Sequence, residues 1–385
     1  MKDNISRIQA IATKIDEDFD KFFGAVTPPI YENTIYRYPD FESVEAVNKG
    51  NSFRYSYGKN KNPTLDAVEC KLSQMEKGEA AKCFASGTAA MYTALTNYLE
   101  KDDHVVTIKN VYGRIKNFLN DTFTKYGIHT TFVDGKDPKE FEESIRHNTK
   151  IIYLESPSTW QLELQDLKAV ADIARKHNIK TIIDNTWATP VFQNPMEFGI
   201  DMVIHSASKY LGGHSDLVAG VIVASREVIN NLPQLGGVLS PYEAGKLMKG
   251  LRTLAMRMER HQSNAIQVAK LLEKNSKVSE IRYPGLESYD QFDLANKQMH
   301  GFSGLMSFVL ECGRDGEKRF INALKHISIG GSWGGFESII YPIDANESIY
   351  DISQMGYKPR QIRLSVGLES IDTVLSDIEN ALNCI

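Results

Sequence analysis

Over residues 65–225 the chain alternates between short apolar segments and longer segments with helical periodicity. The short segments are rich in β-branched residues and bounded by polar turns, which is typical of strands. The expected strands are 104–108, 129–133, 150–155, 180–185 and 202–206, and the expected helices include 66–78, 87–103 and 166–178. This alternation predicts a mostly parallel α/β sheet with helices on both faces. Because ligands bind beyond the carboxyl ends of such strands, functional residues are expected just after them.

The pattern changes after residue 225. A helical segment over 241–274 is expected to lead into a second domain, although Gly245 and Gly250 argue against one unbroken helix. Shorter apolar and helical segments follow and predict a smaller α+β unit, whereas the first 60 residues show no pattern of a packed domain. The expected division is an N-terminal arm over 1–60, a large domain over 61–245 and a C-terminal α+β domain over 246–385.

Charge and cysteine usage narrow the class of protein. The net charge of −5 argues against bulk attraction to nucleic acid or membrane. No apolar segment approaches the length of a membrane span, and the N-terminus lacks the apolar core of a signal peptide. The four cysteines show no CxxC and no ligand-like spacing, which predicts a reducing compartment, no disulfide framework and no metal site. We therefore expect a cytoplasmic protein with no nucleic-acid or membrane partner.

Two polar residues follow strands of the expected sheet. Asp184 ends one apolar segment, and Lys209 follows the next one beside Ser206, Ser208 and two glycines. A lysine amine attacks an aldehyde to form a Schiff base, while neighbouring hydroxyl and backbone N–H groups can hold phosphate oxygens. An aspartate on a neighbouring strand end can keep a pyridine nitrogen protonated. Taken alone, Lys209 is better explained as a solvated charge and Asp184 as a turn cap, because surface charges are the default.

Three further features likewise have both a functional and a purely structural explanation. The segment Ser86-Gly87-Thr88 opens a helix, where free N–H groups bind anions, but Ser and Thr also cap helices that bind nothing. Tyr112 follows a strand and can stack on a planar ring, although an isolated tyrosine is more often part of the packing. Arg363 lies in an alternating strand and suits a substrate carboxylate, or else a surface ion pair.

Taken together, the chain resembles the pyridoxal-phosphate (PLP) enzymes of cysteine and methionine metabolism, which include cystathionine lyases, methionine γ-lyases, homoserine-ester sulfhydrylases and cystathionine synthases. The resemblance runs from about residue 50 to 383 and rests on nine blocks in the family's order. They are NPT (62–64), ASG (85–87), YG (112–113), ESP (155–157), DNTWA (184–188), FGIDMVIHSASKYLGGHSD (198–216), GLRTL (250–254), SWGGFES (332–338) and IRLSVGLE (362–369). The resemblance implies the type I PLP-dependent transferase fold, with a large, mostly parallel sheet domain and a smaller α+β domain.

The resemblance also implies roles for the matching residues. Lys209 would form the Schiff base with PLP and then move the substrate proton. Asp184 would pair with the pyridine nitrogen, and Tyr112 would stack on the ring and help in proton transfer. The residues expected to hold the cofactor phosphate are Ser86, Gly87, Thr88, Ser206 and Ser208.

Other matching residues would bind the substrate or a neighbouring subunit's cofactor. Arg363 would bind the substrate α-carboxylate, with Ser332 and Trp333 beside it. In this family a tyrosine and an arginine before NPT reach across a subunit interface to the neighbour's phosphate. These two positions align with Tyr57 and Lys59, so lysine stands where the family usually has arginine. The arm would then contribute to an adjacent subunit, in a homo-oligomer that is typically a tetramer of two dimers.

The reaction type rests on fewer residues. ESPSTW (155–160) lacks the asparagine-proline pair common in γ-lyases, and Trp333 stands where γ-acting relatives usually carry leucine, so both resemble cystathionine β-lyases. Arg114 replaces the reactive cysteine of methionine γ-lyases, while Gly331 fits neither the β nor the γ pattern. The expected reaction is α,β-elimination on L-cystathionine or L-cysteine, which gives pyruvate, ammonia and a thiol.

Two alternatives remain at this point. One is a γ-acting relative: cystathionine γ-lyase, methionine γ-lyase, or an O-acylhomoserine sulfhydrylase or cystathionine γ-synthase. The other is a PLP-binding regulator without enzymatic activity. The joint presence of Lys209, Asp184, Tyr112 and Arg363 argues for an enzyme that acts on a small sulfur amino acid.

Overall fold

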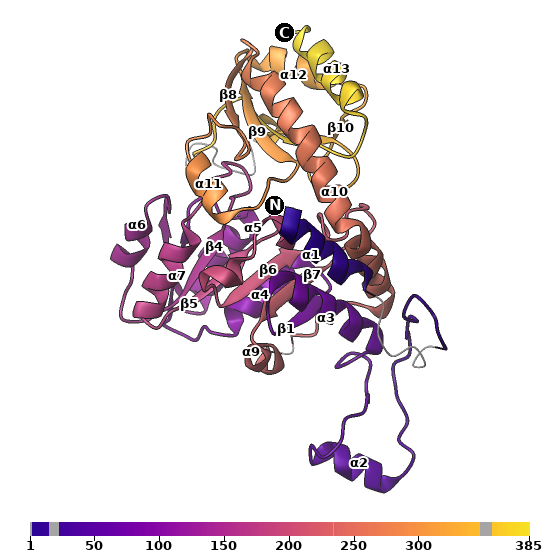
Figure 1. The fold of residues 1–385 in the computed structure, drawn as a ribbon. Helices are drawn as coiled ribbons and strands as arrows, with labels where there is room; N and C mark the ends of the chain where they lie inside the picture. The colour runs from indigo at the N-terminus through magenta and orange to yellow at the C-terminus, as the bar shows by residue number, and fades with distance from the viewer. Residues whose placement is uncertain (1, 15–22, 234, 347–355) are drawn as a thin grey trace.

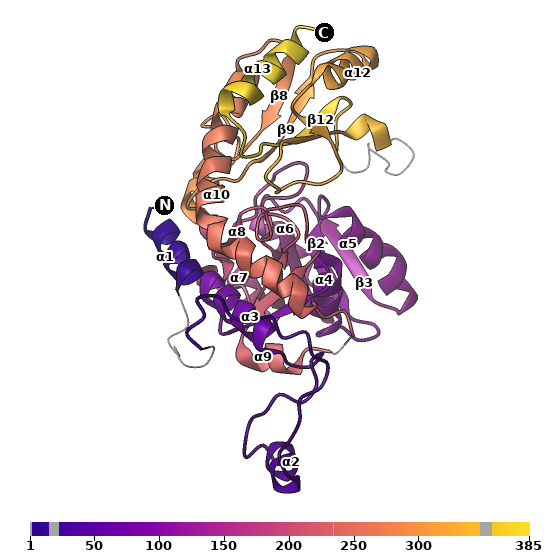
Figure 2. The same ribbon diagram turned by 90° about the vertical axis from the view of Figure 1, so that its right-hand side faces the viewer.

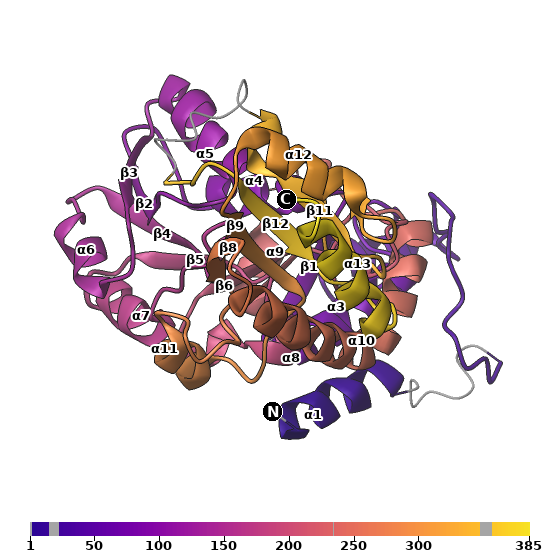
Figure 3. The same ribbon diagram turned by 90° about the horizontal axis from the view of Figure 1, so that it is seen from above.

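A computed structural model describes residues 2–14, 23–233, 235–346 and 356–385. The chain forms a large sheet and a smaller sheet joined by one long helix (Figure 1). Viewed from above, the small sheet lies over the middle of the large one (Figure 3). No helix in these ranges is long and apolar enough to cross a membrane.

The large sheet has seven strands in the order β1-β7-β6-β5-β4-β2-β3. They are β1 (Ala80–Phe84), β2 (His104–Ile108), β3 (His129–Val133), β4 (Thr149–Glu155), β5 (Lys180–Asp184), β6 (Met202–Ser206) and β7 (Gly220–Ala224). The pairs that β7 makes with β1 and β6 are antiparallel, and all the other pairs in this sheet are parallel. The mostly parallel sheet is thus confirmed, and the five expected strands are found with ends shifted by at most one residue.

The helices of this part begin where the sequence supplies caps. Asp166 accepts from the backbone N–H of Ala169, and the apolar side of the helix that follows is buried. The helices are α3 (Pro63–Glu76), α4 (Gly87–Thr96), α5 (Gly113–Asn117), the π-helix η2 (Phe118–Phe123), α6 (Pro138–Glu143), α7 (Leu167–Lys176), α8 (Thr189–Phe192), the 3₁₀ helix η3 (Pro195–Phe198) and α9 (Arg226–Asn231).

The small sheet has the order β10-β11-β12-β9-β8 and is antiparallel except between β10 and β11. Its strands are β8 (Val278–Arg282), β9 (Leu305–Leu310), β10 (Ser328–Ile329), β11 (Ile339–Pro342) and β12 (Gln361–Ser365). The accompanying helices are α11 (Phe292–Gln298), α12 (Arg314–Ala323), the 3₁₀ helix η4 (Ile343–Asn346) and α13 (Ile371–Leu382).

Helix α10 (Pro241–Glu273) runs unbroken from the large sheet to the small one (Figure 2), contrary to the expectation raised by its two glycines. Both glycines are explained by tertiary packing. A Cβ at Gly250 would lie 2.3 Å from the carbonyl oxygen of Gly212, and one at Gly245 would lie 2.7 Å from Ile30. The expected domain boundary at 245/246 falls inside this helix.

The N-terminal 60 residues divide into two parts. Helix α1 (Lys2–Thr13) packs on α3, α8 and α10 and buries Ile5 and Ile8, so it belongs to the body of its own chain. Helix α2 (Phe41–Asn48) buries no residue and lies away from the body at the end of two extended segments (Figure 1). The projecting part of the expected arm is therefore the segment around α2.

Candidate active site

A cavity of about 470 Å³ lies where the carboxyl ends of the large sheet's strands meet the small sheet. The structure brings together in its wall all the predicted site residues except Tyr57 and Lys59. Those that line it are Ser86, Gly87, Thr88, Tyr112, Asp184, Ser206, Ser208, Lys209, Ser332, Trp333 and Arg363. Its volume is that of a small-molecule site, and its walls come from both parts of the chain.

Asp184 is a buried carboxylate at the end of β5. Its Oδ1 accepts a 2.9 Å hydrogen bond from the backbone N–H of Thr186, whose hydroxyl donates to the same oxygen. Burial raises the pKa of Asp184, while these hydrogen bonds and the charges of His205 and Lys209 oppose the rise. The cavity therefore has an acidic group at its base that local donors help to keep ionised.

Glu155 ends β4 in register with Asp184 and received no role from the sequence. Its carboxylate accepts from the backbone N–H of Tyr112 at 2.6 Å and from the hydroxyl of Thr159. Burial, and then the negative charge of Asp184, raise the pKa of Glu155. Of the two carboxyls, Asp184 is thus the better supported as an anion, and Glu155 fixes the start of the Tyr112 segment. The strand-end rule that found Asp184 would also have found Glu155.

Lys209 lies in the turn that follows β6, and its side chain crosses to the small sheet's side of the cavity. Its Nζ donates to Ser332 Oγ at 2.7 Å and lies 5.4 Å from the centre of the Trp333 ring. Burial, and then the charge of Arg363, lower the pKa of Lys209 to about 8, while Asp184 acts in the opposite sense. The amine is therefore neutral, and nucleophilic, at a lower pH than an exposed lysine.

One wall of the cavity suits an anion. Ser86 caps α4 by accepting from Ala89 N–H at 3.0 Å, and the next residues, Gly87 and Thr88, present the start of the helix to the cavity. A Cβ on Gly87 would lie 2.9 Å from the Ser206 side chain, so only glycine allows this close approach. Ser208 exchanges hydrogen bonds with the backbone of Ala219.

Arg363 is buried on β12, where it forms part of the small sheet's wall. Its Nη2 donates to the carbonyl of Gly331 at 3.1 Å, and its Cζ lies 4.7 Å from the centre of the Trp160 ring. Sequence reasoning did not identify Trp160, because its partner lies in the other part of the chain.

Tyr57 and Lys59 lie outside this cavity. Tyr57 forms an isolated antiparallel bridge with Ile35, and Lys59 lines a separate cavity together with Lys61. Within one chain neither reaches the main cavity, so their contact with a neighbour's phosphate stays a prediction. Among the residues that the structure describes, no group of three or more His, Cys, Asp or Glu side chains could hold a metal ion.

Comparison with known proteins decides the family. The model of the Cys/Met metabolism PLP-dependent enzymes matches residues 9–383. The chain belongs to this family. Its cofactor is pyridoxal phosphate, and the resemblance drawn from the nine sequence blocks is confirmed.

Its relatives include lyases of both regiochemistries. The chain is 37% identical to an L-methionine γ-lyase of Pseudomonas putida, over an alignment that covers 93% of each protein. It is 38% identical to a cystathionine β-lyase of Coxiella burnetii (94% of each chain) and 38% identical to a cystathionine γ-lyase of Bacillus subtilis (95% and 96%). The crystal structure of cystathionine γ-lyase from Lactobacillus plantarum complexed with L-serine has a TM-score of 0.90, 33% identity and 99% coverage of both chains.

The cavity fits the cofactor. The close approach at Gly87 leaves the start of α4 open to a phosphate, and the Lys209 amine has the lowered pKa that suits attack on an aldehyde. Asp184 supplies a buried anion for a pyridine nitrogen. The residues that would hold PLP are thus Lys209, Asp184, Tyr112 and the hydroxyl and N–H groups around Ser86, Gly87, Thr88, Ser206 and Ser208.

Proposed function

We propose that this PLP-dependent lyase breaks the Cβ–S bond of L-cystathionine or L-cysteine by α,β-elimination. The observation that carries the proposal is the position of Lys209 between Ser332 and the Trp333 ring. A β-elimination needs one proton removed, at Cα, whereas a γ-elimination also needs a proton removed at Cβ. An amine confined by a hydroxyl and a large ring suits the first task better than the second.

Each residue has a role that follows from its position. Arg363 binds the substrate α-carboxylate and so turns the Cα–H bond toward Lys209, whose neutral amine takes the proton. Bound PLP supplies a sink for the electron pair left at Cα. Asp184 keeps its carboxylate ionised for the pyridinium, and the Thr186 hydrogen bonds hold it in place.

The elimination and the hydrolysis that follows it balance in atoms and charge. The Cα proton moves to Lys209, the Cβ–S bond breaks, and the sulfur leaves as a thiolate that takes up a proton. The enamine that is released tautomerises and hydrolyses to pyruvate and ammonia, with one water consumed. L-cystathionine therefore yields homocysteine, and L-cysteine yields hydrogen sulfide.

A γ-lyase is the second candidate, and the relatives support it as well as they support a β-lyase. An L-methionine γ-lyase and a cystathionine γ-lyase are as similar to the chain as the cystathionine β-lyase is. The fold and the PLP residues serve both reactions, so the choice depends on the reach of Lys209 and on the pocket around the substrate side chain.

We also propose that the active unit is a homodimer, paired further into a tetramer. Helix α2 buries nothing, and the segments around it expose Ile35, Phe41 and Phe53 at 71%, 73% and 61%. Apolar side chains this exposed on a projecting segment are typical of a protein interface. Pairing with a second copy would bring Tyr57 and Lys59 to the neighbour's cofactor phosphate.

Two substrates test the proposed regiochemistry. L-cysteine carries its leaving group at Cβ, whereas L-methionine carries it only at Cγ. The holoenzyme is expected to release pyruvate from L-cysteine and no 2-oxobutyrate from L-methionine, with Lys209→Ala as the blank. Turnover of L-methionine at a rate equal to that of L-cysteine would contradict the proposal.

A further inference from the structure

The loop between β4 and α7, residues 158–164, forms a closed turn of fixed shape. Ser158 N–H donates to the Glu163 carbonyl at 3.0 Å, and Leu162 N–H donates to the Ser158 carbonyl at 3.1 Å. Leu162 is fully buried with φ of 54°, a left-handed conformation that a leucine adopts only when its surroundings impose it.

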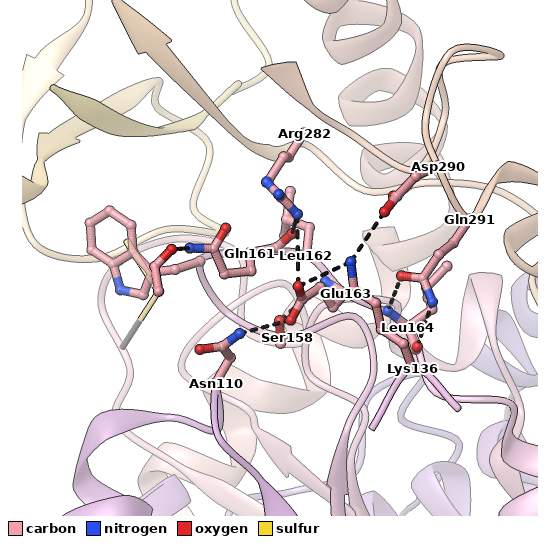
Figure 4. Close-up of polar contacts among 12 residues, drawn as sticks. Asn110, Lys136, Ser158, Gln161, Leu162, Glu163, Leu164, Arg282, Asp290 and Gln291 are labelled. Carbon is pink, nitrogen blue, oxygen red and sulfur yellow. Dashed lines mark hydrogen bonds and ion pairs between the residues drawn. The ribbon is translucent and has the colours of Figure 1, made fainter. Parts of the chain in front are cut away.

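Glu163 ties this loop to both parts of the chain (Figure 4). Its carboxylate accepts from Asn110 Nδ2 at 2.7 Å and pairs with Lys136 at 3.3 Å, both on the large sheet's side. On the small sheet's side it lies 3.9 Å from Arg282 of β8. The loop is therefore anchored across the junction that contains the cavity.

The residues that flank Trp160 are held as well. Gln291 forms two 2.8 Å hydrogen bonds with the backbone of Leu164, and Gln161 Nε2 donates to the Gly356 carbonyl at 2.8 Å (Figure 4). With the Ser158 hydrogen bonds before Trp160 and these contacts after it, the backbone that carries the indole is held on both sides.

Trp160 contacts a row of residues that are in register on three neighbouring strands of the small sheet. Tyr341, Arg363 and Ser307 are partners in register across β11, β12 and β9. Ser307 Oγ donates to the Trp160 carbonyl at 2.8 Å, and the indole lies 4.7 Å from the Arg363 Cζ and 6.3 Å from the Tyr341 ring. Both the backbone and the ring of Trp160 therefore contact the row that carries the arginine.

This contact restricts the guanidinium. An aromatic ring attracts a guanidinium at its face, most strongly where both are withdrawn from water, and Arg363 is buried. The hydrogen bond from Nη2 to Gly331 fixes one edge of the group, and the indole restrains its plane. Arg363 lines the cavity and the indole contacts its guanidinium, so the ring would act on a bound carboxylate through the arginine.

We propose that Trp160 is a positioning residue that holds the plane of the Arg363 guanidinium for two-point binding of a substrate α-carboxylate, and so sets the selection of α-amino acids over analogues without that carboxylate. The inference rests on the proposed function only in the role that it gives Arg363. Bidentate binding depends on the orientation of the guanidinium, so a group free to tilt loses affinity for carboxylates in particular.

The test uses two ligands with no leaving group. The holoenzyme is titrated with L-alanine and with L-alaninamide, in which the carboxylate is an uncharged amide, and binding is read from the cofactor absorbance. In Trp160→Leu, we expect L-alanine to bind about tenfold more weakly while L-alaninamide changes less than about twofold. Trp160→Phe retains an aromatic face and should recover most of the affinity for L-alanine.

Two further variants separate the explanations. Gln161→Ala removes one anchor of the loop but keeps the indole and the contacts of Gln291, Glu163 and Ser307, so it should bind both ligands as the wild type does. An equal loss for both ligands in Trp160→Leu, no loss at all, or the same loss in Gln161→Ala would overturn the inference. Arg363→Ala should abolish the preference for L-alanine. If that variant keeps the preference, the carboxylate-binding role that the proposed function gives Arg363 fails; if it loses the preference and Trp160→Leu does not, only the role of Trp160 fails.

Discussion

At the scale of single residues, the site depends on charges withdrawn from water. Lys209 has its pKa lowered to about 8 by burial and by Arg363, while Asp184 is held by Thr186. Asp184 and Lys209, which the sequence identified, lie at or just after the ends of strands, where local sequence patterns are informative. Glu155 could have been found by the same rule, since it ends β4 beside Asp184. The pairing of Trp160 with Arg363 could not, because no local pattern links residues so far apart in the sequence.

The charge of Arg363 gives a prediction about pH. We propose that the apoprotein captures the PLP aldehyde through the neutral Lys209 amine, so the capture rate should rise as the pH increases through about 8. Because Arg363 lowers the pKa of Lys209, Arg363→Ala should raise that pKa and move the midpoint to higher pH. Stopped-flow absorbance during PLP addition measures the midpoint. A midpoint that is unchanged, or that moves to lower pH, would show that Arg363 does not act on Lys209.

At the scale of elements, the strands were predictable because each is a short, self-contained apolar segment. The extent of helix α10 was predicted as well, but not its continuity, because the sequence shows Gly250 only as a poor helix former. The structure shows why glycine is present: the helix backbone lies against the Leu211 and Gly212 carbonyls, which follow Lys209. This close packing joins the helix that links the two sheets to the turn that carries the active-site lysine.

Gly250→Ala should therefore impair both stability and the site. The added Cβ would lie 2.3 and 2.5 Å from two carbonyl oxygens, and such overpacking costs about 1–3 kcal/mol in the free energy of unfolding. We expect weaker PLP binding as well, because the Lys209 turn must shift. Gly313→Ala is the matched control, since nothing lies within 4 Å of its Cβ position. Denaturant unfolding and equilibrium dialysis of PLP measure the two effects; equal behaviour of both variants would contradict this account.

At the scale of the whole molecule, one chain holds a nearly complete site. The predicted residues that lie outside it are Tyr57, which bridges Ile35, and Lys59, which lines a separate cavity with residues of α3 and β1. The sequence resemblance gave these two residues a partner subunit, and the exposed apolar side chains around α2 agree with an interface there.

Dimers formed from two different variants test whether each site is shared between two subunits. Lys59→Ala should weaken PLP binding more than Lys61→Ala does, because Lys59 matches the phosphate-binding position. When Lys59→Ala chains are refolded together with Lys209→Ala chains, one site of each mixed dimer regains both lysines. Activity at limiting PLP should then exceed that of either variant alone. Activity no higher than the average of the two would mean that Lys59 serves its own chain or no site.

The most direct measurement uses L-cystathionine, because both elimination routes are open on this one molecule. β-Elimination releases pyruvate and homocysteine, whereas γ-elimination releases 2-oxobutyrate and cysteine. The holoenzyme is incubated with L-cystathionine, and the two keto acids are separated and quantified by chromatography. We expect pyruvate as the main keto acid, with none formed by Lys209→Ala. 2-Oxobutyrate without pyruvate would contradict the proposed β-elimination.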